Sequence, residues 1–279
     1  MTDQAAKART FEALHTSGNM FILPNPWDVG SARILAGLGF PALATTSAGF
    51  ANWQKGAPDY GVTRDDVLTH VRTLVLATDL PITADLENGF GHTPECCAET
   101  IRLGAEAGLV GGSIEDFTGD RAAPQYSIGQ AAERIVAAAE AANALAFPFL
   151  VTARAENYLT GNPDLADTIA RLQAYQEAGA QVLYAPGLRT LADIRTVLAS
   201  IDRPLNVLLG PFEGFVSLAE LAYLGVARVS MGSALANAAF GALIRAGEEL
   251  LGPGTLDFLA DAADSETRDR LLGHAHAPN

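Results

Sequence analysis

Short apolar runs rich in β-branched residues alternate along the chain with longer segments in which apolar residues recur at helical spacing. The runs predict eight strands, each followed by a helix, and one further helix is expected at residues 4–16. The predicted strands cover residues 20–23, 42–46, 82–86, 110–114, 149–153, 181–184, 205–208 and 228–231. The predicted helices cover residues 29–39, 64–78, 94–107, 128–146, 163–178, 191–200, 217–224 and 233–251.

A glycine closes several of these helices just before the next strand, at Gly39, Gly108, Gly179 and Gly225. Glycine can adopt the left-handed conformation that ends a helix, so the repeated order of strand, helix and glycine is typical of βα units. Eight consecutive units favour an α/β fold closed into a (β/α)8 TIM barrel. An open doubly wound sheet is the alternative, but no G-x-G-x-x-G motif follows the first strand.

The chain shows no Pro- or Ser-rich linker and no shift in composition, which predicts a single barrel domain over residues 1–279. Residues 252–279 follow the eighth unit and carry one more helical pattern, at 256–272, before a Gly-His-Ala-His-Ala-Pro-Asn end. We therefore expect a C-terminal helix and a frayed tail beyond the barrel.

Acidic residues outnumber basic ones, with 32 Asp+Glu against 18 Lys+Arg and a formal net charge of −14. Nucleic-acid binding depends on basic side chains and is therefore disfavoured, whereas a small anionic substrate needs only a local cation. The start of the chain has no apolar signal core and no long uninterrupted apolar run occurs, so we expect a cytoplasmic enzyme with no membrane segment. The adjacent Cys96 and Cys97 are interpreted as two reduced thiols.

Polar side chains interrupt strands that a parallel barrel should bury on both faces. In the third strand Thr83, Asp85 and Glu87 alternate with apolar residues, so these three share the face turned to the barrel axis. All of the interrupting residues stand at the carboxyl ends of their strands, the edge where barrel active sites are built. The same alternation turns further side chains inward: Thr45, Ser47, Ser113, Glu115, Thr152 and Arg154.

Carboxylates gathered in a barrel mouth must protonate, pair with cations or bind a metal. Oxygen ligands without Cys or His at matching spacing favour a hard ion such as Mg²⁺, with Mn²⁺ as an alternative. An internal ion-pair network of Asp85, Glu87, Glu115 and Arg154 is the competing interpretation. Beside a metal, Arg154 is suited to hold a substrate carboxylate with two parallel hydrogen bonds.

The connection after the second strand, residues 47–61, is long, rich in glycine and carries Asp59. The small residues Ser47, Ala48 and Gly49 would let backbone N–H groups approach an anionic oxygen. An ordinary surface loop is equally compatible with this sequence. In the loop after the third strand, His92 is a candidate proton donor, although a lone loop histidine is more often a solvated bystander.

Several of these stretches together resemble the isocitrate lyase/phosphoenolpyruvate mutase superfamily. They are Pro24-Asn-Pro-Trp-Asp28, Thr46-Ser-Ala-Gly-Phe-Ala51, Pro58-Asp-Tyr-Gly61, Thr83-Ala-Asp-Leu-Glu-Asn-Gly-Phe-Gly91, Ile114-Glu-Asp116, Ala153-Arg154 and Asn206-Val-Leu-Leu-Gly-Pro211. The resemblance runs from about Pro24 to Gly241 and implies a magnesium-dependent (β/α)8 barrel that stabilises an enolpyruvate-type oxyanion.

The resemblance also implies roles for individual residues. Asp85 resembles the direct metal ligand, and Asp59, Glu87 and Glu115 resemble the acids that hold metal-bound waters. Ser47 and the amides near Gly49, with Thr45 and Ala48 beside them, resemble the group that binds the carboxylate or phosphonate of the substrate. Arg154 resembles the substrate-binding arginine, and Asn206 falls near a further polar contact. The implied assembly is a homodimer or homotetramer in which the C-terminal helix is exchanged between subunits.

Two departures from the family pattern narrow the implied activity. Residues 117–125 lack the cysteine and histidine that the isocitrate and methylisocitrate lyases carry after strand four. Strand six ends in Tyr184 where the phosphonomutase branch typically has histidine. We therefore expect a lyase or decarboxylase acting on a small 2-oxo or 2-hydroxy dicarboxylic acid. Phosphonopyruvate or phosphoenolpyruvate chemistry, and a non-catalytic 2-oxo acid binder, are the alternatives.

Overall fold

The computed structural model describes residues 3–210, 212 and 216–273. The predicted tail after Gly273 and the end of the Asn206–Pro211 stretch therefore lie outside the described residues. In the described part, no helix combines the length and apolar character needed to span a membrane.

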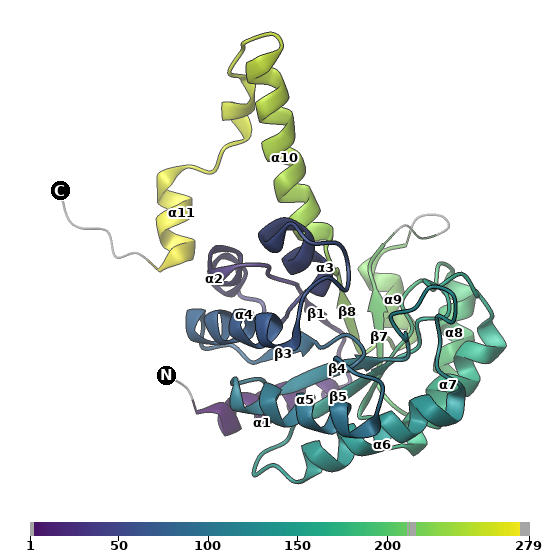
Figure 1. The fold of residues 1–279 in the computed structure, drawn as a ribbon. Coiled ribbons are helices and arrows are strands. Elements are labelled where there is room, and N and C mark those ends of the chain that lie inside the picture. Colours follow the sequence, from purple (N-terminus) through teal and green to yellow (C-terminus); the bar gives the residue numbers. More distant parts are fainter. Residues whose placement is uncertain (1–2, 211, 213–215, 274–279) are drawn as a thin grey trace.

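Eight parallel strands form one sheet that curls into a nearly closed barrel, confirming the predicted (β/α)8 fold (Figure 1). The ladders run from β1 through β8 and then in descending order to β2. Across the remaining β1–β2 edge the Ala44 amide donates to the Pro24 carbonyl at 3.0 Å. The strands are β1 (Phe21–Leu23), β2 (Leu43–Ala44), β3 (Ile82–Asp85), β4 (Gly111–Glu115), β5 (Leu150–Arg154), β6 (Val182–Tyr184), β7 (Leu205–Leu208) and β8 (Arg228–Ser230).

Helices follow the strands and cover the outside of the barrel, within a few residues of the bounds that the sequence predicts (Figure 1). Four of them begin with a reciprocal capping box in which the side chains of N-cap and N3 residues satisfy each other's amides. The helices that cover the barrel are α2 (Val29–Gly37), α4 (Arg64–Ala77), α5 (Pro94–Glu106), α6 (Ile128–Asn143), α7 (Leu165–Glu177), α8 (Leu191–Leu198) and α9 (Leu218–Leu224). Helix α10 (Ala234–Leu251) follows β8.

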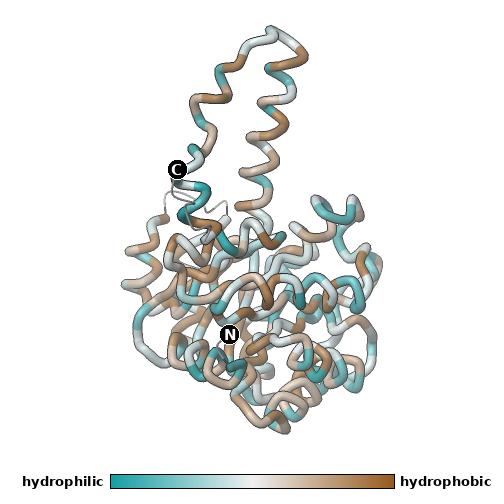
Figure 2. The backbone as a smooth tube through the Cα atoms, turned by 90° about the vertical axis from the view of Figure 1, so that its left-hand side faces the viewer, coloured by the Kyte–Doolittle hydropathy of each residue, from teal (hydrophilic) through white to brown (hydrophobic). Residues whose placement is uncertain are grey.

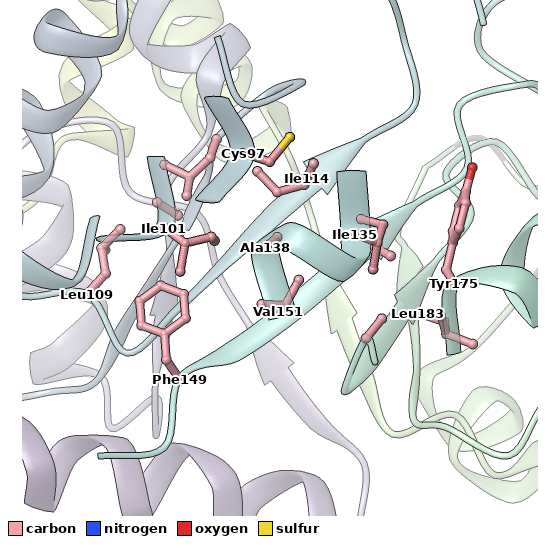
Figure 3. Close-up of a cluster of buried hydrophobic side chains, with 14 of the residues drawn as sticks. Cys97, Ile101, Leu109, Ile114, Ile135, Ala138, Phe149, Val151, Tyr175 and Leu183 are labelled. Atoms are coloured by element: carbon pink, nitrogen blue, oxygen red, sulfur yellow. The ribbon is translucent and has the colours of Figure 1, made fainter. Parts of the chain in front are cut away.

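The largest hydrophobic core lies between the strands and these helices. Ile101 of α5 and Ile135 of α6 pack with Ile114 of β4 and Val151 of β5, as Figure 3 shows. A second core closes the amino end of the barrel, where Phe11 of helix α1 (Gln4–Thr16) packs against residues at the beginnings of several strands. This core closes the barrel interior at the amino ends of the strands, so a site is expected at their carboxyl ends.

The C-terminal region leaves the barrel and returns to it. Helix α10 projects as an arm, and the chain turns back so that α11 (Ser265–Leu272) lies against α2 of the same chain (Figures 1 and 2). The prediction of a single helix at 256–272 is wrong. A 3-10 helix, η2 (Asp257–Asp261), is followed by extended backbone at Ala262, and Asp264 begins α11 by accepting the Thr267 amide.

Candidate active site

Arg154 at the end of β5 is the centre of an ion-pair network in the barrel mouth. Its guanidinium lies 3.0 Å from Asp85 on β3, 3.2 Å from Glu115 on β4 and 2.7 Å from Glu156. Because parallel strands end at the same edge, the inward-facing positions of adjacent strands bring these groups together. Burial alone would lower the pKa of Arg154, but the charges of the neighbouring acids raise it above its ordinary value. Three members of the ion-pair network considered from sequence, Asp85, Glu115 and Arg154, are therefore paired in this arrangement, with Glu156 in the place expected for Glu87.

Asp85 is held by several donors besides Arg154. Ser47 donates its hydroxyl to one carboxylate oxygen at 2.7 Å, and the Glu87 amide donates to the other at 3.2 Å. The backbone amide of Asp85 in turn donates to the hydroxyl of Thr45 at 3.0 Å. These contacts fix the carboxylate at the edge of the barrel mouth and bring together three residues that the sequence pattern singles out.

Glu87 is buried beside this cluster but forms no ion pair among the described residues. Its Oε1 has no hydrogen-bond partner in the described chain, and the residue is 5% exposed. Burial, followed by the charge of Asp85, raises the pKa of Glu87 to about 8. An orphaned buried carboxylate oxygen is costly, so this position is favourable for a cation or another hydrogen-bond donor.

Glu115 and Glu156 are both buried, and desolvation raises the pKa of each above its ordinary value despite the charge of Arg154. Tyr60 donates its phenol to Glu115 at 2.6 Å. The sequence pattern assigned no role to Glu156, although it stands two residues after Arg154 and so shares the inward face. Nothing in the local sequence indicates the contact between Tyr60 and Glu115, which are 55 residues apart.

The segment after β2, expected as a long glycine-rich loop, is helical over its first part. Thr46 caps the short helix α3 (Ser47–Gly49), which also contains Ala48, and the chain continues into a π-helix, η1 (Phe50–Lys55). The amide of Gly49 donates to the Thr46 hydroxyl and is thus engaged within the cap. Trp53 anchors the segment by stacking on Phe240 of α10, with ring centroids 4.4 Å apart.

Asp59 lies apart from the acidic cluster. It is exposed and accepts a hydrogen bond from the side-chain amide of Asn52 at 2.9 Å, and in the described chain it forms no ion pair with Arg154. It borders a neighbouring cavity of about 470 Å³ together with Tyr60 and Glu156. The predicted role of Asp59 therefore requires that the segment carrying it moves inward.

His92 borders an open cavity of about 590 Å³ that Tyr60 and Glu87 also line. Its Nδ1 lies 2.7 Å from the Tyr126 hydroxyl, which fixes the orientation of the ring. The structure thus places His92 on the approach to the acidic cluster, where an imidazole could exchange protons with a ligand.

A smaller cavity of about 60 Å³ lies at the barrel mouth itself, bordered by Asp85, Arg154 and Asn206. The side chain of Asn206 is buried and bonded to its neighbours: it accepts from Arg228 at 2.9 Å and donates to Ser230 at 3.0 Å. Asn206 therefore borders the cavity with its polar atoms already in use. The cavity is large enough for a few waters or one small polar group.

Backbone strain concentrates at the same mouth. Among the described non-glycine residues, Tyr60, Glu87 and Phe90 have positive φ, at 60°, 48° and 56°. Left-handed backbone at such residues is unfavourable and persists where surrounding contacts impose it, often at functional sites. At Glu87 the left-handed backbone ends the alternation of side chains along β3. The carboxylate therefore points in a direction that the alternation in the sequence does not predict.

The donor set is compatible with a divalent cation, but the side chains are not arranged around one. In the part of the chain that the structure describes, no three His, Cys, Asp or Glu side chains are grouped to hold a metal. Arg154 stands between Asp85 and Glu115 and satisfies their oxygens. The unpaired Oε1 of Glu87 nevertheless fits Mg²⁺, because Asp85, Glu87 and Glu115 offer only oxygen ligands.

Comparisons with known proteins identify the family of the chain. The sequence profile of the Phosphoenolpyruvate phosphomutase family matches residues 11–251. A solved structure from Burkholderia cenocepacia J2315, provisionally described as a lyase/mutase, is 54% identical with a TM-score of 0.94, covering 97% of either chain. The 2-methylisocitrate lyase of Escherichia coli (strain K12) is 30% identical over 202 residues, covering 71% of this chain and 68% of that protein. The oxaloacetate decarboxylase of Pseudomonas entomophila (strain L48) is 27% identical over 231 residues, covering 80% and 78%.

Proposed function

Because the chain belongs to the isocitrate lyase/phosphoenolpyruvate mutase superfamily, we propose that it is a magnesium-dependent carbon–carbon lyase or decarboxylase. Its substrate is a small 2-oxo or 2-hydroxy dicarboxylic acid. The observation that carries the proposal is the cluster of Asp85, Glu115 and Arg154 around a small polar cavity at the mouth of the barrel.

The reaction requires stabilisation of a negative oxygen. When a 2-oxo dicarboxylate such as oxaloacetate loses its C4 carboxylate as carbon dioxide, the electrons of the broken C3–C4 bond move to the 2-oxo oxygen and form an enolate. The carbon then takes a proton and the keto acid is restored. Fixed positive charge near that oxygen lowers the barrier, because the charge develops only as the bond breaks.

Several residues of this chain have roles in that chemistry. Arg154 binds and orients a substrate carboxylate with its fork of N–H donors, exchanging part of its contacts with the acids. Ser47 and Thr45 hold Asp85 in place through the bonds described above. His92 is the candidate proton donor, since it lines the cavity that opens beside Glu87.

Asp85, Glu87, Glu115 and, after movement of its segment, Asp59 are the residues that would hold the metal. Bound Mg²⁺, or Mn²⁺ in its place, supplies a Lewis acid that favours negative charge on the substrate oxygens. Asn206 and the backbone of Ala48 and Gly49 border or flank the same mouth and are proposed to shape the substrate pocket.

A panel assay tests the proposal. Purified protein is incubated with oxaloacetate, 2-methylisocitrate, 2-methylmalate or phosphonopyruvate, and pyruvate release is followed with magnesium and with chelator. We expect release from at least one carbon–carbon substrate, lost on chelation and lowered at least about 100-fold by Asp85→Asn. Asp202→Asn, an exposed acid remote from the mouth, serves as the matched control and should retain full activity.

Phosphonate chemistry is the second candidate because the matching family profile bears the name of a phosphomutase. Pyruvate release from phosphonopyruvate alone would favour it over the lyase proposal. A third result, ligand binding without turnover of any substrate, would favour a non-catalytic binder and would refute the enzyme assignment.

A further inference from the structure

Arg228 is a second arginine in the barrel and pairs in register with Asn206 on the adjacent strand β7. It begins β8, its side chain is 4% exposed, and it borders the same 60 Å³ cavity as Asp85 and Arg154. The proposed reaction assigns no role to Arg228.

All hydrogen-bond partners of the Arg228 guanidinium in the described chain are neutral. Its Nε donates to Asn206 at 2.9 Å, and Nη2 donates to the Thr152 hydroxyl at 3.0 Å. Its Nη1 lies 3.1 Å from Nε2 of His15 on α1.

The protonation of His15 follows from its other contact. Its Nδ1 lies 2.8 Å from the Phe11 carbonyl, which can only accept, so Nδ1 carries the proton and Nε2 accepts from Arg228. Burial, reinforced by the charge of Arg228, lowers the pKa of His15 to about 3. At neutral pH His15 is therefore an uncharged acceptor.

The charge of Arg228 is thus not balanced locally. Arg154 contacts three carboxylates, whereas no carboxylate of the described chain lies within ion-pair distance of Arg228. Burial lowers the pKa of Arg228 to about 10, and it stays charged at neutral pH. A buried charge without a counter-ion is unfavourable, and a bound anion would relieve that cost.

We propose that Arg228 is a specificity-determining residue that makes the mouth cavity select small dianionic acids over monoanionic acids of the same shape. The inference rests on the proposed function, since it concerns the ligand of the same site. The three bonds to neutral partners leave two of the five guanidinium N–H groups for water or ligand. The competing role is structural, with Arg228 balancing the excess of carboxylates at the mouth.

Oxalate and oxamate form a matched pair of probes, because they share shape and differ by one charge. Their dissociation constants are measured by calorimetry in the presence of magnesium for wild type, Arg228→Met, Arg228→Lys and His15→Glu. We expect wild type to prefer oxalate, and Arg228→Met to lower that preference at least about tenfold. Chelation of magnesium by oxalate is common to all variants and cancels when preferences are compared.

The other variants separate selectivity from folding. Arg228→Lys retains the charge and should keep most of the preference. His15→Glu places a carboxylate beside the unchanged arginine and should lower the preference even where Arg228→Met fails to fold. Circular dichroism and thermal unfolding verify that each variant is native.

Each outcome is decisive. A preference unchanged in native Arg228→Met, or in His15→Glu where Arg228→Met does not fold, would overturn the inference and leave the proposed function intact. If wild type binds neither probe, the proposed function itself fails and the inference with it.

Discussion

Acidification should destabilise this protein through His70, a buried histidine of α4 that supports the mouth segment. Its ring stacks on Phe50 of the π-helix with centroids 4.1 Å apart, and its Nε2 is buried without a hydrogen-bond partner. Burial lowers the pKa of His70 to about 4, with the charge of Asp28 opposing the shift. The native state therefore resists protonation of this ring.

The size and sign of the effect follow from linkage. An unperturbed histidine has a pKa of about 6.5, so between pH 6.5 and 4 the unfolded chain binds the proton and the native chain does not. The stability that neutral His70 provides is complete above about pH 6.5 and is lost as pH falls toward 4. Each pH unit in this window corresponds to about 1.4 kcal/mol, so at pH 5 the loss from this residue is about 2 kcal/mol.

Equilibrium unfolding in urea at pH 5, 6, 7 and 8, at fixed protein concentration, measures this loss. His70→Leu removes the titrating group, and its stability should fall about 2 kcal/mol less than that of wild type between pH 8 and 5. Val71→Ala, at a fully buried position of the same helix, is the matched control. It should lower stability equally at every pH. Equal pH dependence in wild type and His70→Leu would refute the reasoning.

Two further predictions concern packing and assembly. A Cβ at Gly111 would stand 2.8 Å from the Leu150 carbonyl oxygen, so Gly111→Ala should lower the free energy of unfolding, measured in denaturant, by about 1–3 kcal/mol. Gly129→Ala is the control, because a Cβ there meets open space and should not destabilise the protein. Equal effects of the two substitutions would contradict the steric argument. The α10 arm exposes Leu243 at 66% and Leu250 at 51%, and we predict that it forms a contact between subunits. Light scattering should then show an oligomer whose mass falls in the Leu243→Glu/Leu250→Glu variant, and a wild-type monomer would refute this.

Much of the fold follows from local sequence. Alternating apolar runs and glycine-terminated helices determine eight βα units, because strand and helix periodicities and left-handed glycines are properties of short segments. Strand parity also determines that Asp85, Glu115 and Arg154 face the axis. The split of the C-terminal helix was missed because the Asp264 cap competes with a continuous helical pattern, and local preference alone does not decide between them.

The tertiary structure decided which of these groups meet. Tyr60 reaches Glu115, Glu156 joins Arg154, and Asp59 remains outside, because each contact depends on the path of a connecting segment rather than on periodicity. The positive φ of Glu87 likewise overrides strand parity. Arg228 and His15 are 213 residues apart, and only barrel closure over α1 places a neutral imidazole beside that buried charge. Sequence determined the chemical groups available at the mouth, and closure of the barrel determined their partners and therefore their charge.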